Sequence, residues 1–469
     1  MKTLVLGYGK TGRALTEYII KNNVFPEGIA VYDDNLKEKD INIPGVQFFT
    51  GRNDVHEISL CLASPGIDRE HKILSKLRSV NIPVISEIEF AYNQLVSKEK
   101  GKTKPKILAI TGTNGKTTTT AICKDAIIKS GLGEEVFVGG NFGTPFISGA
   151  GLFNGFILEI SSFQLEWIYN FKPDISVLLN VEDDHLDRYE NFDEYRLTKY
   201  KLFKNMDYGD VSILNYEDYN SRILKGVMGT RSILFGFDEN RCDAFYKDGF
   251  IHLKFKDIAG YDLEISLEKL KDKKRYIIED MLAAASSLCL FGISPEHITS
   301  AFNEFEPLSH RIEYIGSIGN IEFYDDSKAT NPAAVISALK TLMDDGRHLR
   351  VTVKKDIVLI LGGKDKGFSY ESLIEPVASN VRACVLMGET KNILMETLKG
   401  HIELIPVNDM DEAVKESYLF LKNNYPGGSG AVLLSPASSS FDMFKDYNDR
   451  GAVFCRSFKA LKARQDALI

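Results

Sequence analysis

Short apolar runs rich in β-branched residues alternate with longer stretches of helical periodicity along most of the chain, and this alternation restricts the fold more than any other feature. Strands that alternate with helices form β-α-β units, whose strands lie parallel and are covered by helices. The predicted strands are Thr3–Leu6, Ile29–Tyr32, Ile107–Ile110, Phe156–Ile160, Ile175–Asn180, Ile357–Leu361, Ala383–Met387 and Ala431–Leu434. The sequence therefore predicts an α/β fold built on parallel sheets.

Two breaks in the alternation divide the chain. Ser97–Lys106 is polar, contains Gly and Pro, and comes directly before a predicted strand, so it indicates a linker. A weaker break lies near Phe305–Pro307, after a predicted helix at Glu279–Phe291, and the two-residue alternation of Asp243–Ser266 predicts a hairpin between the breaks. A chain of 469 residues has room for roughly two to four domains of ordinary size. We expect three α/β domains, over residues 1–99, 100–306 and 307–469.

Composition argues against several classes of protein. The chain has 57 Lys plus Arg and 65 Asp plus Glu, a net charge of −8, whereas general binders of nucleic acids or anionic membranes need a positive field. Six cysteines lie far apart without a C-x-x-C pair, as in a protein with reduced thiols. The N-terminus, MKTLVLGYGK, runs directly into a strand, and no apolar run approaches the roughly 18 residues of a membrane span. We expect a cytoplasmic protein that neither binds nucleic acid nor inserts into a membrane.

A glycine loop follows the first predicted strand. Gly7, Gly9 and Gly12 form the pattern G-x-G-x-x-G, and Asp33 ends the second strand. Such a loop lets backbone N–H groups approach a diphosphate at a helix N-terminus, and an acidic residue at the end of the second strand suits a ribose or a base. On these residues alone the obvious ligand is NAD, and the alternative is a tight turn that binds nothing.

A second and more specific loop, Thr111–Thr118, follows the predicted strand KILAIT. Gly115, Lys116 and Thr117 supply backbone donors, a lysine for the β- and γ-phosphates and a hydroxyl for Mg²⁺. Ala109 stands where the strict pattern G-x-x-x-x-G-K-T has its first glycine. We predict an ATP site here, with a chance Gly-Lys-Thr turn as the alternative.

Polar residues follow two further predicted strands. Glu159 and His185 come at or after the carboxyl ends of these strands, where an open parallel sheet gathers its ligands. A carboxylate and an imidazole beside a phosphate loop suit Mg²⁺ or Mn²⁺. A single histidine is more often structural, so only its position relative to the second loop distinguishes His185.

Eight segments, in chain order, resemble motifs of the Mur ligases of peptidoglycan synthesis. They are Thr111–Thr118, Gly139–Asn141, Leu158–Glu166, Asn180–Asp187, His310–Arg311, Asp325–Asn331, Leu361–Lys366 and Leu434–Asp442. The match covers nearly the whole chain. Ser161–Glu166 and Asp326–Asn331 most resemble the family member that adds D-glutamate, and the N-terminal glycine loop is similar to the family loop that holds UDP rather than NAD.

The resemblance implies an N-terminal Rossmann-like UDP domain, a central P-loop ATPase-like domain with a parallel sheet, and a C-terminal Rossmann-like domain. It implies that ATP phosphorylates the terminal carboxylate of UDP-N-acetylmuramoyl-L-alanine (UDP-MurNAc-L-Ala) and that the amine of D-glutamate attacks the acyl phosphate. The implied cofactors are ATP, Mg²⁺ at two sites with Mn²⁺ as a substitute, and CO₂ as a carbamate on Lys199. We expect a monomer whose partners are these small molecules.

The family's functional residues fall on matching positions of this sequence. The implied ATP contacts are Gly112, Thr113, Asn114, Gly115, Lys116, Thr117, Thr118, Arg311 and Asp326. The implied UDP-substrate contacts are Tyr8, Gly9, Lys10, Thr11, Asp33, Asp34, Ser64, Pro65, Gly66, Asn141 and His185. The implied D-glutamate contacts are Thr330, Lys366, Ser440, Phe441 and Tyr447. The implied metal ligands are Thr117, Glu159, His185 and carbamylated Lys199, and the implied catalytic residues are Lys116, Glu159, His185, Lys199 and Lys328.

Some features depart from the family pattern or leave it open. Ile277 and Asp280 replace two asparagines of the family's His-Asn-x-x-Asn segment, so its adenine contacts are not carried over. Asp344–Asp356 is longer than expected between a helix and a strand, and Lys199 without the resemblance is one more charge on a helical face. Competing interpretations are another amide ligase of the superfamily, an NAD-dependent oxidoreductase with an incidental second loop, and a non-catalytic nucleotide-binding switch.

Overall fold

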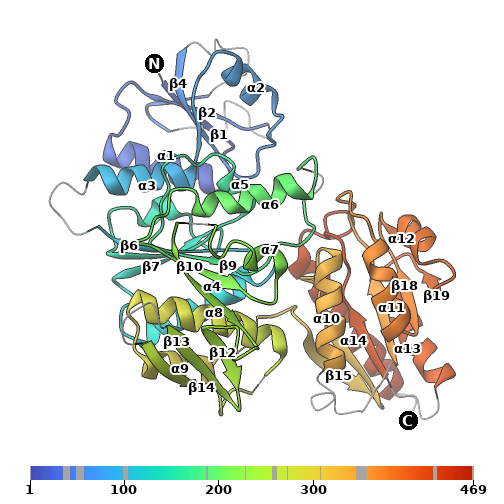
Figure 1. The fold of residues 1–469 in the computed structure, drawn as a ribbon. Helices are drawn as coiled ribbons and strands as arrows, with labels where there is room; N and C mark the ends of the chain where they lie inside the picture. The colour runs from blue at the N-terminus through green and yellow to red at the C-terminus, as the bar shows by residue number, and fades with distance from the viewer. Residues whose placement is uncertain are drawn as a thin grey trace. The chain divides into compact units, whose positions relative to one another are not determined.

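The computed structural model describes residues 2–34, 43–48, 57–98, 104–185, 188–227, 229–255, 261–271, 273–306, 308–344, 356–425 and 430–466. Their strands form three sheets with helices packed against them (Figure 1). The chain divides into two compact units. The first unit comprises Met1–Val181, Asp193–Lys271 and Ile277–Phe305 and contains two of the sheets, and the second comprises Glu182–Phe192, Asp272–Tyr276 and Glu306–Ile469 and contains the third.

The first sheet has five parallel strands in the order β3-β2-β1-β4-β5. The strands are β1 (Lys2–Leu6), β2 (Ile29–Tyr32), β3 (Val46–Phe48), β4 (Ile58–Ala63) and β5 (Val84–Ser86), and the helices are α1 (Lys10–Asn22), α2 (Lys72–Ser79) and α3 (Glu87–Lys98). The strand order reverses at β1, which lies between β2 and β4. Because ligands of open α/β sheets bind beyond the carboxyl end of a strand at such a reversal, the first glycine loop occupies the expected position.

The second sheet has nine strands in the order β14-β13-β12-β11-β10-β9-β6-β8-β7. They are β6 (Lys106–Thr111), β7 (Val136–Gly140), β8 (Gly155–Glu159), β9 (Ile175–Leu178), β10 (Val211–Asn215), β11 (Arg231–Gly236), β12 (Ala244–Lys247), β13 (Phe250–Phe255) and β14 (Tyr261–Ser266). The strands from β7 to β12 pair in parallel, whereas β13 pairs antiparallel with β12 and β14. The predicted hairpin within Asp243–Ser266 is thereby confirmed.

The helices associated with the second sheet include one that starts directly at the second glycine loop. They are α4 (Lys116–Lys129), α5 (Ser162–Leu165), α6 (Phe192–Tyr200), α7 (Tyr219–Arg222), α8 (Arg275–Phe291) and α9 (Pro295–Asn303), with short 3₁₀ turns η3 (Phe146–Gly149) and η4 (Lys201–Phe203). Gly115 precedes α4 with a φ of +84°, a left-handed conformation that glycine adopts without steric cost. The strand order reverses again at β6, which lies between β8 and β9, so this loop also lies at a switch point of its sheet.

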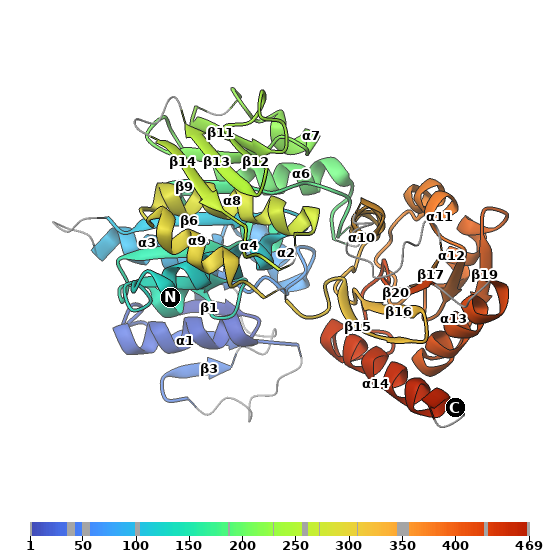
Figure 2. The ribbon, with the colours of Figure 1, turned by 90° about the horizontal axis from the view of Figure 1, so that it is seen from below.

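The third sheet has six strands in the order β15-β16-β20-β17-β18-β19, and only the edge strand β15 is antiparallel to its neighbour. The strands are β15 (Glu313–Ile318), β16 (Ile321–Asp325), β17 (Ile357–Leu361), β18 (Ala383–Leu386), β19 (Glu403–Pro406) and β20 (Gly430–Leu434). The helices are α10 (Pro332–Asp344), α11 (Ile374–Asn380), α12 (Lys391–Leu398), α13 (Met410–Asn424) and α14 (Tyr447–Asp466), with the 3₁₀ turn η5 (Glu371–Leu373). Two separate hydrophobic clusters pack against this sheet, one with α10 to α12 and one with α13 and α14. Figure 2 shows these helices around the strands.

The expected α/β class with three parallel-rich sheets is confirmed, and the eight predicted strands all exist with ends shifted by no more than two residues. The predicted helix at Glu279–Phe291 begins earlier, at Arg275, and α9 follows it without having been predicted. Ser97 and Lys98 of the predicted linker belong to α3, while residues 99–103 and most of the segment 344–356 lie outside the described residues. Each described helix is too short or too polar to cross a bilayer.

Candidate active site

The first glycine loop is held by side chains from neighbouring strands. The backbone N–H of Tyr8 donates to Oδ2 of Asp33 at 2.7 Å, and the Ser64 hydroxyl donates to the carbonyl oxygen of Gly7 at 2.8 Å. A Cβ on Gly12 would lie 2.0 Å from that same carbonyl oxygen, so only glycine fits there. The loop is therefore tied to the ends of β2 and β4 before α1 begins.

The next acidic residue is placed differently from Asp33. Asp34 accepts a hydrogen bond from the hydroxyl of Tyr32 at 2.7 Å, and its Oδ2 lies 3.2 Å from Nε2 of His71. The Tyr32 hydroxyl lowers the pKa of Asp34, while burial and the hydrogen bond to Asp34 raise the pKa of Tyr32 to about 12. The expected UDP-substrate residues that this edge of the sheet brings together are Tyr8, Gly9, Lys10, Thr11, Asp33, Asp34, Ser64, Pro65 and Gly66.

A cavity of about 530 Å³ extends from the first glycine loop toward η3. It is lined by Gly9, Lys10, Arg13, Ala14, Glu17, Thr144, Pro145 and Ser148. Lys10 reaches across and donates a hydrogen bond to the carbonyl oxygen of Gly143, two residues after the expected sugar contact Asn141. Arg13 and Glu17 were not predicted, because only the fold brings this face of α1 next to the segment that follows β7.

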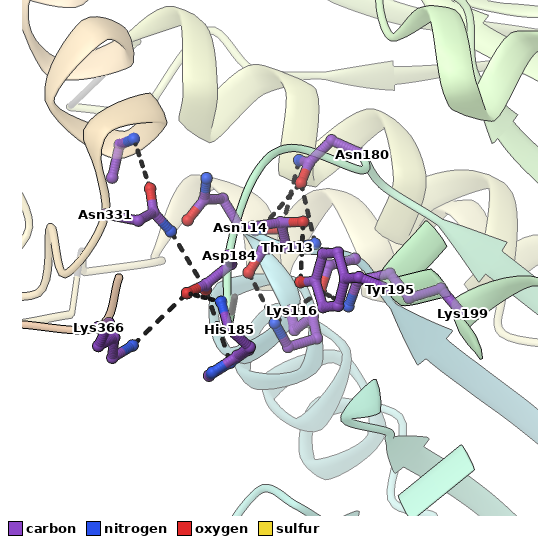
Figure 3. Close-up of polar contacts among 12 residues, drawn as sticks. Thr113, Asn114, Lys116, Asn180, Asp184, His185, Tyr195, Lys199, Asn331 and Lys366 are labelled. Carbon is purple, nitrogen blue, oxygen red and sulfur yellow. Dashed lines mark hydrogen bonds and ion pairs between the residues drawn. The ribbon is translucent and has the colours of Figure 1, made fainter. Parts of the chain in front are cut away.

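The side chain of Asn180, to which we had assigned no role, stabilises the second glycine loop. Asn180, just after β9, accepts hydrogen bonds at its Oδ1 from the backbone N–H groups of Thr113 (3.1 Å) and Asn114 (2.8 Å). Lys116 folds back over the loop and donates to the carbonyl oxygens of Gly112 and Thr113, both at 2.7 Å (Figure 3). The loop thus holds its lysine at the N-terminus of α4, where a phosphate would bind.

Lys199 is buried against this loop. Its side chain is on α6, the residue is 1% exposed, and Nζ donates to the carbonyl oxygen of Gly112 at 2.8 Å. Nζ also lies 4.6 Å from the ring centroid of Tyr195, whose hydroxyl is 3.1 Å from Oγ1 of Thr113 (Figure 3). This burial excludes the alternative that Lys199 is an exposed charge on a helical face.

Glu159 offers an unused oxygen at the end of β8. The residue is 1% exposed, and its Oε1 accepts a hydrogen bond from Nδ2 of Asn141 at 2.6 Å. Its Oε2 is buried without a hydrogen-bond partner among the described residues. A buried carboxylate oxygen normally has a partner, so this atom fits a ligand for a divalent cation.

Asp280 lies directly beside the second loop. Its Oδ1 accepts a hydrogen bond from the hydroxyl of Thr119 at 3.2 Å, and a Cβ on Gly115 would lie 2.4 Å from the same oxygen. The residue is buried, so an acidic side chain packs close to the loop expected to bind a polyphosphate. We did not predict this contact, because it depends on α8 packing against a loop more than 150 residues earlier in the chain.

In the second unit, one aspartate connects residues with different predicted roles. Asp184 accepts a hydrogen bond at Oδ1 from the backbone N–H of His185 at 2.9 Å, and the same oxygen lies 3.5 Å from Nζ of Lys366. Its Oδ2 accepts from Nδ2 of Asn331 at 3.3 Å (Figure 3). The unit therefore brings the expected metal ligand His185 close to the expected D-glutamate residue Lys366, through an aspartate that was not predicted.

The segment after β16 contains a second buried carboxylate. Asp326 accepts hydrogen bonds from the hydroxyl of Ser435 at 2.7 Å and the backbone N–H of Ile312 at 3.3 Å. Burial raises its pKa to about 7, although Ser435 and the nearby charge of Arg311 act in the opposite direction. Asp326 is thus a structural acceptor for two neighbouring segments as well as an expected ATP contact.

Four of the five expected D-glutamate residues lie on loops that follow parallel strands of the second unit, and the fifth, Tyr447, begins α14. Nζ of Lys328 is 3.7 Å from the ring centroid of Tyr447, the first residue of α14. Ser440 is buried, Thr330 is half-buried, and Phe441 is 70% exposed.

Known proteins match this chain in sequence over nearly its whole length. The family described as Mur ligase middle domain matches residues 110–270, and the family described as Mur ligase, glutamate ligase domain, matches residues 310–437. The UDP-N-acetylmuramoylalanine--D-glutamate ligase of Thermoanaerobacter pseudethanolicus is 33% identical, with 98% of both chains covered. The protein of the same name from Citrifermentans bemidjiense is 36% identical, also with 98% of both chains covered.

Solved structures of lower identity share the fold. UDP-N-acetylmuramate-alanine ligase MurC from Thermotoga maritima has a TM-score of 0.57 at 18% identity, covering 98% of this chain and 100% of its own. MurF from Acinetobacter baumannii has a TM-score of 0.58 at 16% identity, covering 79% of each chain.

Proposed function

The chain belongs to the Mur ligase family, and we propose that it is the ATP-dependent ligase that adds D-glutamate to UDP-MurNAc-L-Ala in the synthesis of peptidoglycan precursors. The observation that carries this proposal is the identity of 33% and 36% to two D-glutamate ligases over 98% of the chain. The gathering of Lys116, Glu159 and Lys199 at the second glycine loop supports it, because a simple oxidoreductase would have no use for these three side chains.

The reaction has two steps. A carboxylate oxygen of the alanyl group attacks the γ-phosphorus of ATP, the bond from phosphorus to the bridging oxygen breaks, and ADP leaves. The amine nitrogen of D-glutamate then attacks the acyl carbon of the acyl phosphate and forms a tetrahedral intermediate. When this intermediate collapses, the bond from carbon to the phosphate oxygen breaks, inorganic phosphate leaves, and the nitrogen loses a proton to give the amide.

The first step must overcome charge repulsion. Two like charges 4 Å apart repel by about 4 kcal/mol at an effective dielectric constant of 20. Lys116 carries the positive charge of the phosphate loop, and the backbone N–H groups at the start of α4 add partial positive charge. We assign ATP binding to Gly112 through Thr118, Arg311 and Asp326, with Lys328 orienting the phosphate.

Divalent cations fit the chemistry of the residues present. The buried, unpartnered Oε2 of Glu159 and the hydroxyl of Thr117 suit one Mg²⁺, and His185 and Lys199 in its carbamylated form suit a second. Carbamylation by CO₂ would turn a buried cation into an anionic oxygen ligand. When bound, Mg²⁺, or Mn²⁺ in its place, neutralises phosphate charge and polarises the phosphoryl group.

The remaining residues are assigned to the two other substrates. The first glycine loop, Asp33, Asp34 and Ser64–Gly66 bind the UDP moiety, and Asn141 lies toward the sugar and its peptide arm. Thr330, Lys366, Ser440, Phe441 and Tyr447 bind D-glutamate, because a dicarboxylate needs both a positive charge and directed donors. We assign the reaction to the cytoplasm and to a monomer.

The proposal is tested by phosphate release from ATP in the presence of UDP-MurNAc-L-Ala, with D-Glu, L-Glu, L-Ala and L-Lys offered in separate reactions. Turnover with D-Glu alone is expected. Turnover with another amino acid would retain the mechanism and overturn the substrate assignment, and a wild-type protein that turns over with none of the four would contradict the proposal as a whole.

A further inference from the structure

Arg450 is a buried arginine on α14 of the second unit. The residue is 1% exposed and is among the largest fully buried side chains of the described chain. Its Nε donates to the hydroxyl of Ser327 at 3.0 Å and its Nη2 to the carbonyl oxygen of Ser327 at 2.7 Å. Its Nη1 donates to the carbonyl oxygens of Ser438 at 2.9 Å and Ser439 at 3.2 Å. One guanidinium group thus forms hydrogen bonds to two separate loops.

These two loops follow the paired parallel strands β16 and β20. The loop after β16 contains Ser327, Lys328 and Thr330, and the loop after β20 contains Ser438–Phe441. At the ends of the strands, the backbone N–H of Asp326 donates to the carbonyl oxygen of Leu434 at 2.8 Å, and the Ser435 hydroxyl donates to Asp326 at 2.7 Å. Farther along the loops, the guanidinium of Arg450, whose donors have fixed mutual geometry, joins Ser327 to Ser438 and Ser439 and so helps to set the loop separation.

The network extends to a third loop. The carbonyl oxygen of Ser439 also accepts from the backbone N–H of Lys364 at 2.8 Å, two residues before Lys366. The hydroxyl of Ser438 lies 3.2 Å from Oγ1 of Thr390, which accepts from the backbone N–H of Gly363 at 3.1 Å. The loop after β17 is thereby fixed to the same two serines that Arg450 holds.

The first turn of α14 belongs to the network as well. The Ser327 hydroxyl accepts from Arg450 and donates to the carbonyl oxygen of Tyr447 at 2.8 Å. The ring of Tyr447 in turn lies under Nζ of Lys328. All five expected D-glutamate residues are therefore on segments that Arg450 contacts directly or through one serine.

The partners of Arg450 are neutral oxygens. Among the described residues no carboxylate oxygen lies within ion-pair distance of its guanidinium, and the carboxylates of Asp325, Asp326 and Asp442 act only at longer range. Burial lowers the pKa of Arg450 to about 10, because removing the charged guanidinium from water is unfavourable. An apolar side chain would fill the same space without the free-energy cost of burying a charge. It could not, however, make the hydrogen bonds that fix the positions of the loops.

We propose that Arg450 is a positioning residue for D-glutamate: by hydrogen bonds to Ser327, Ser438 and Ser439 it helps to set the spacing of the loops that carry Thr330, Ser440 and Lys366. This inference rests on the proposed function. Arg450 does not contact the amino acid itself, and it acts through the geometry of residues that do.

The test compares Arg450→Lys with wild type in full steady-state kinetics. Lysine keeps the charge but lacks the fork, so the KM for D-Glu should rise about 10-fold or more, since small displacements of positioning groups are costly. The KM values for ATP and for UDP-MurNAc-L-Ala should change by less than about 2-fold, because the two glycine loops lie in the first unit and Asp326 is held by Ser435 and Ile312 rather than by Arg450. Ser327→Ala removes one partner only and should raise the KM for D-Glu by about 3-fold.

Phe454→Leu is the matched control. Phe454 lies one turn along α14, is fully buried, and packs in the apolar cluster of α13 and α14, and no hydrogen bond to the three loops depends on its side chain. It should lower the melting temperature as much as Arg450→Lys does and leave the KM for D-Glu unchanged. If both Arg450→Lys and Ser327→Ala behave like Phe454→Leu, or raise all three KM values equally, Arg450 is merely structural and the inference fails. A wild-type enzyme inactive with D-Glu would instead remove the proposed function.

Discussion

Nζ of Lys199 donates a hydrogen bond at 2.8 Å to the carbonyl oxygen of Gly112, which lies 87 residues earlier in the chain. The bond joins α6 to the second glycine loop at a position from which water is excluded. A lysine buried beside a phosphate loop, rather than solvated on a helix, is a candidate for chemistry.

Replacing Lys199 should therefore impair catalysis more than folding. Lys199→Met removes the amine on which a carbamate could form, so kcat should fall by about 100-fold or more. Lys201→Met is the control: Lys201 is a half-buried lysine two residues later whose Nζ donates to the carbonyl oxygen of Glu166 at 3.0 Å. If a carbamate is required, formate or acetate should restore part of the activity of Lys199→Met. Equal loss in the two variants would contradict the assignment of Lys199.

Lys366 and Lys364 allow a matched test of the D-glutamate site. Lys366 makes a half-buried contact with Asp184, whereas Lys364 pairs with the exposed Glu389 at 2.7 Å. Because a hydrogen bond to a charged group contributes about 1.5–3 kcal/mol, Lys366→Met should raise the KM for D-Glu by about 10- to 100-fold. Lys364→Met should change it by less than about 2-fold, since exposed ion pairs contribute little. A larger effect of Lys364→Met than of Lys366→Met would reverse the assignment.

Asp280 should weaken ATP binding through its charge. Asp280→Asn retains an oxygen that can accept from Thr119 and removes the negative charge beside Gly115. The KM for ATP should fall by about 3- to 10-fold, because repulsion from the triphosphate is reduced. Thr119→Val keeps the carboxylate and removes only its donor, so it should not lower this KM. An increase in the KM for ATP with Asp280→Asn would show that the carboxylate is needed for binding.

From the burial of the Glu87 carboxyl group we predict that the stability of the protein depends on pH. It is the first residue of α3, its Oε1 accepts from the backbone N–H of Ile147 at 2.6 Å, and its Oε2 has no partner among the described residues. Burial raises its pKa from 4.5 to about 7. The folded protein thus binds this proton more tightly than the unfolded chain, so the residue destabilises the fold increasingly as pH rises from about 4.5 to 7, and fully above that.

The comparison is between Glu87→Gln and wild type in urea unfolding at pH 5, 6, 7 and 8. The stability of the variant relative to wild type should increase by about 2 to 3 kcal/mol from pH 5 to pH 8, because a shift of one pKa unit corresponds to about 1.4 kcal/mol. The control is Glu304→Gln. Hydrogen bonds from Lys129 and Ser300 lower the pKa of this exposed glutamate, so its difference from wild type should stay constant over that range. A constant difference for Glu87→Gln would contradict the prediction.

Much of the fold could be predicted because its signals are local. Apolar runs such as Ile357–Leu361 are buried on both faces of a parallel sheet. Their composition and length can be recognised in the sequence without knowing which strands they pair with. Glycine loops are visible for the same reason, since Gly12 and Gly115 are required by backbone geometry within a few residues. The unpredicted α9 follows α8 after a short connection, where the division into two helices depends on Pro295 at its start.

The sequence by itself determined the α/β class and the two glycine loops, and it supplied the residues to which we assign phosphoryl and acyl transfer. Only the tertiary structure decided which of them meet. Nothing in the local sequence distinguishes Lys199 from Lys201, yet only Lys199 is buried against the second glycine loop. Arg450 can bond to two loops only because β16 and β20 are neighbours in the sheet. The physical reason is that periodicity and turn chemistry act over a few residues, whereas burial of a charge and its hydrogen-bond partners depend on segments that are tens to hundreds of residues apart in the chain.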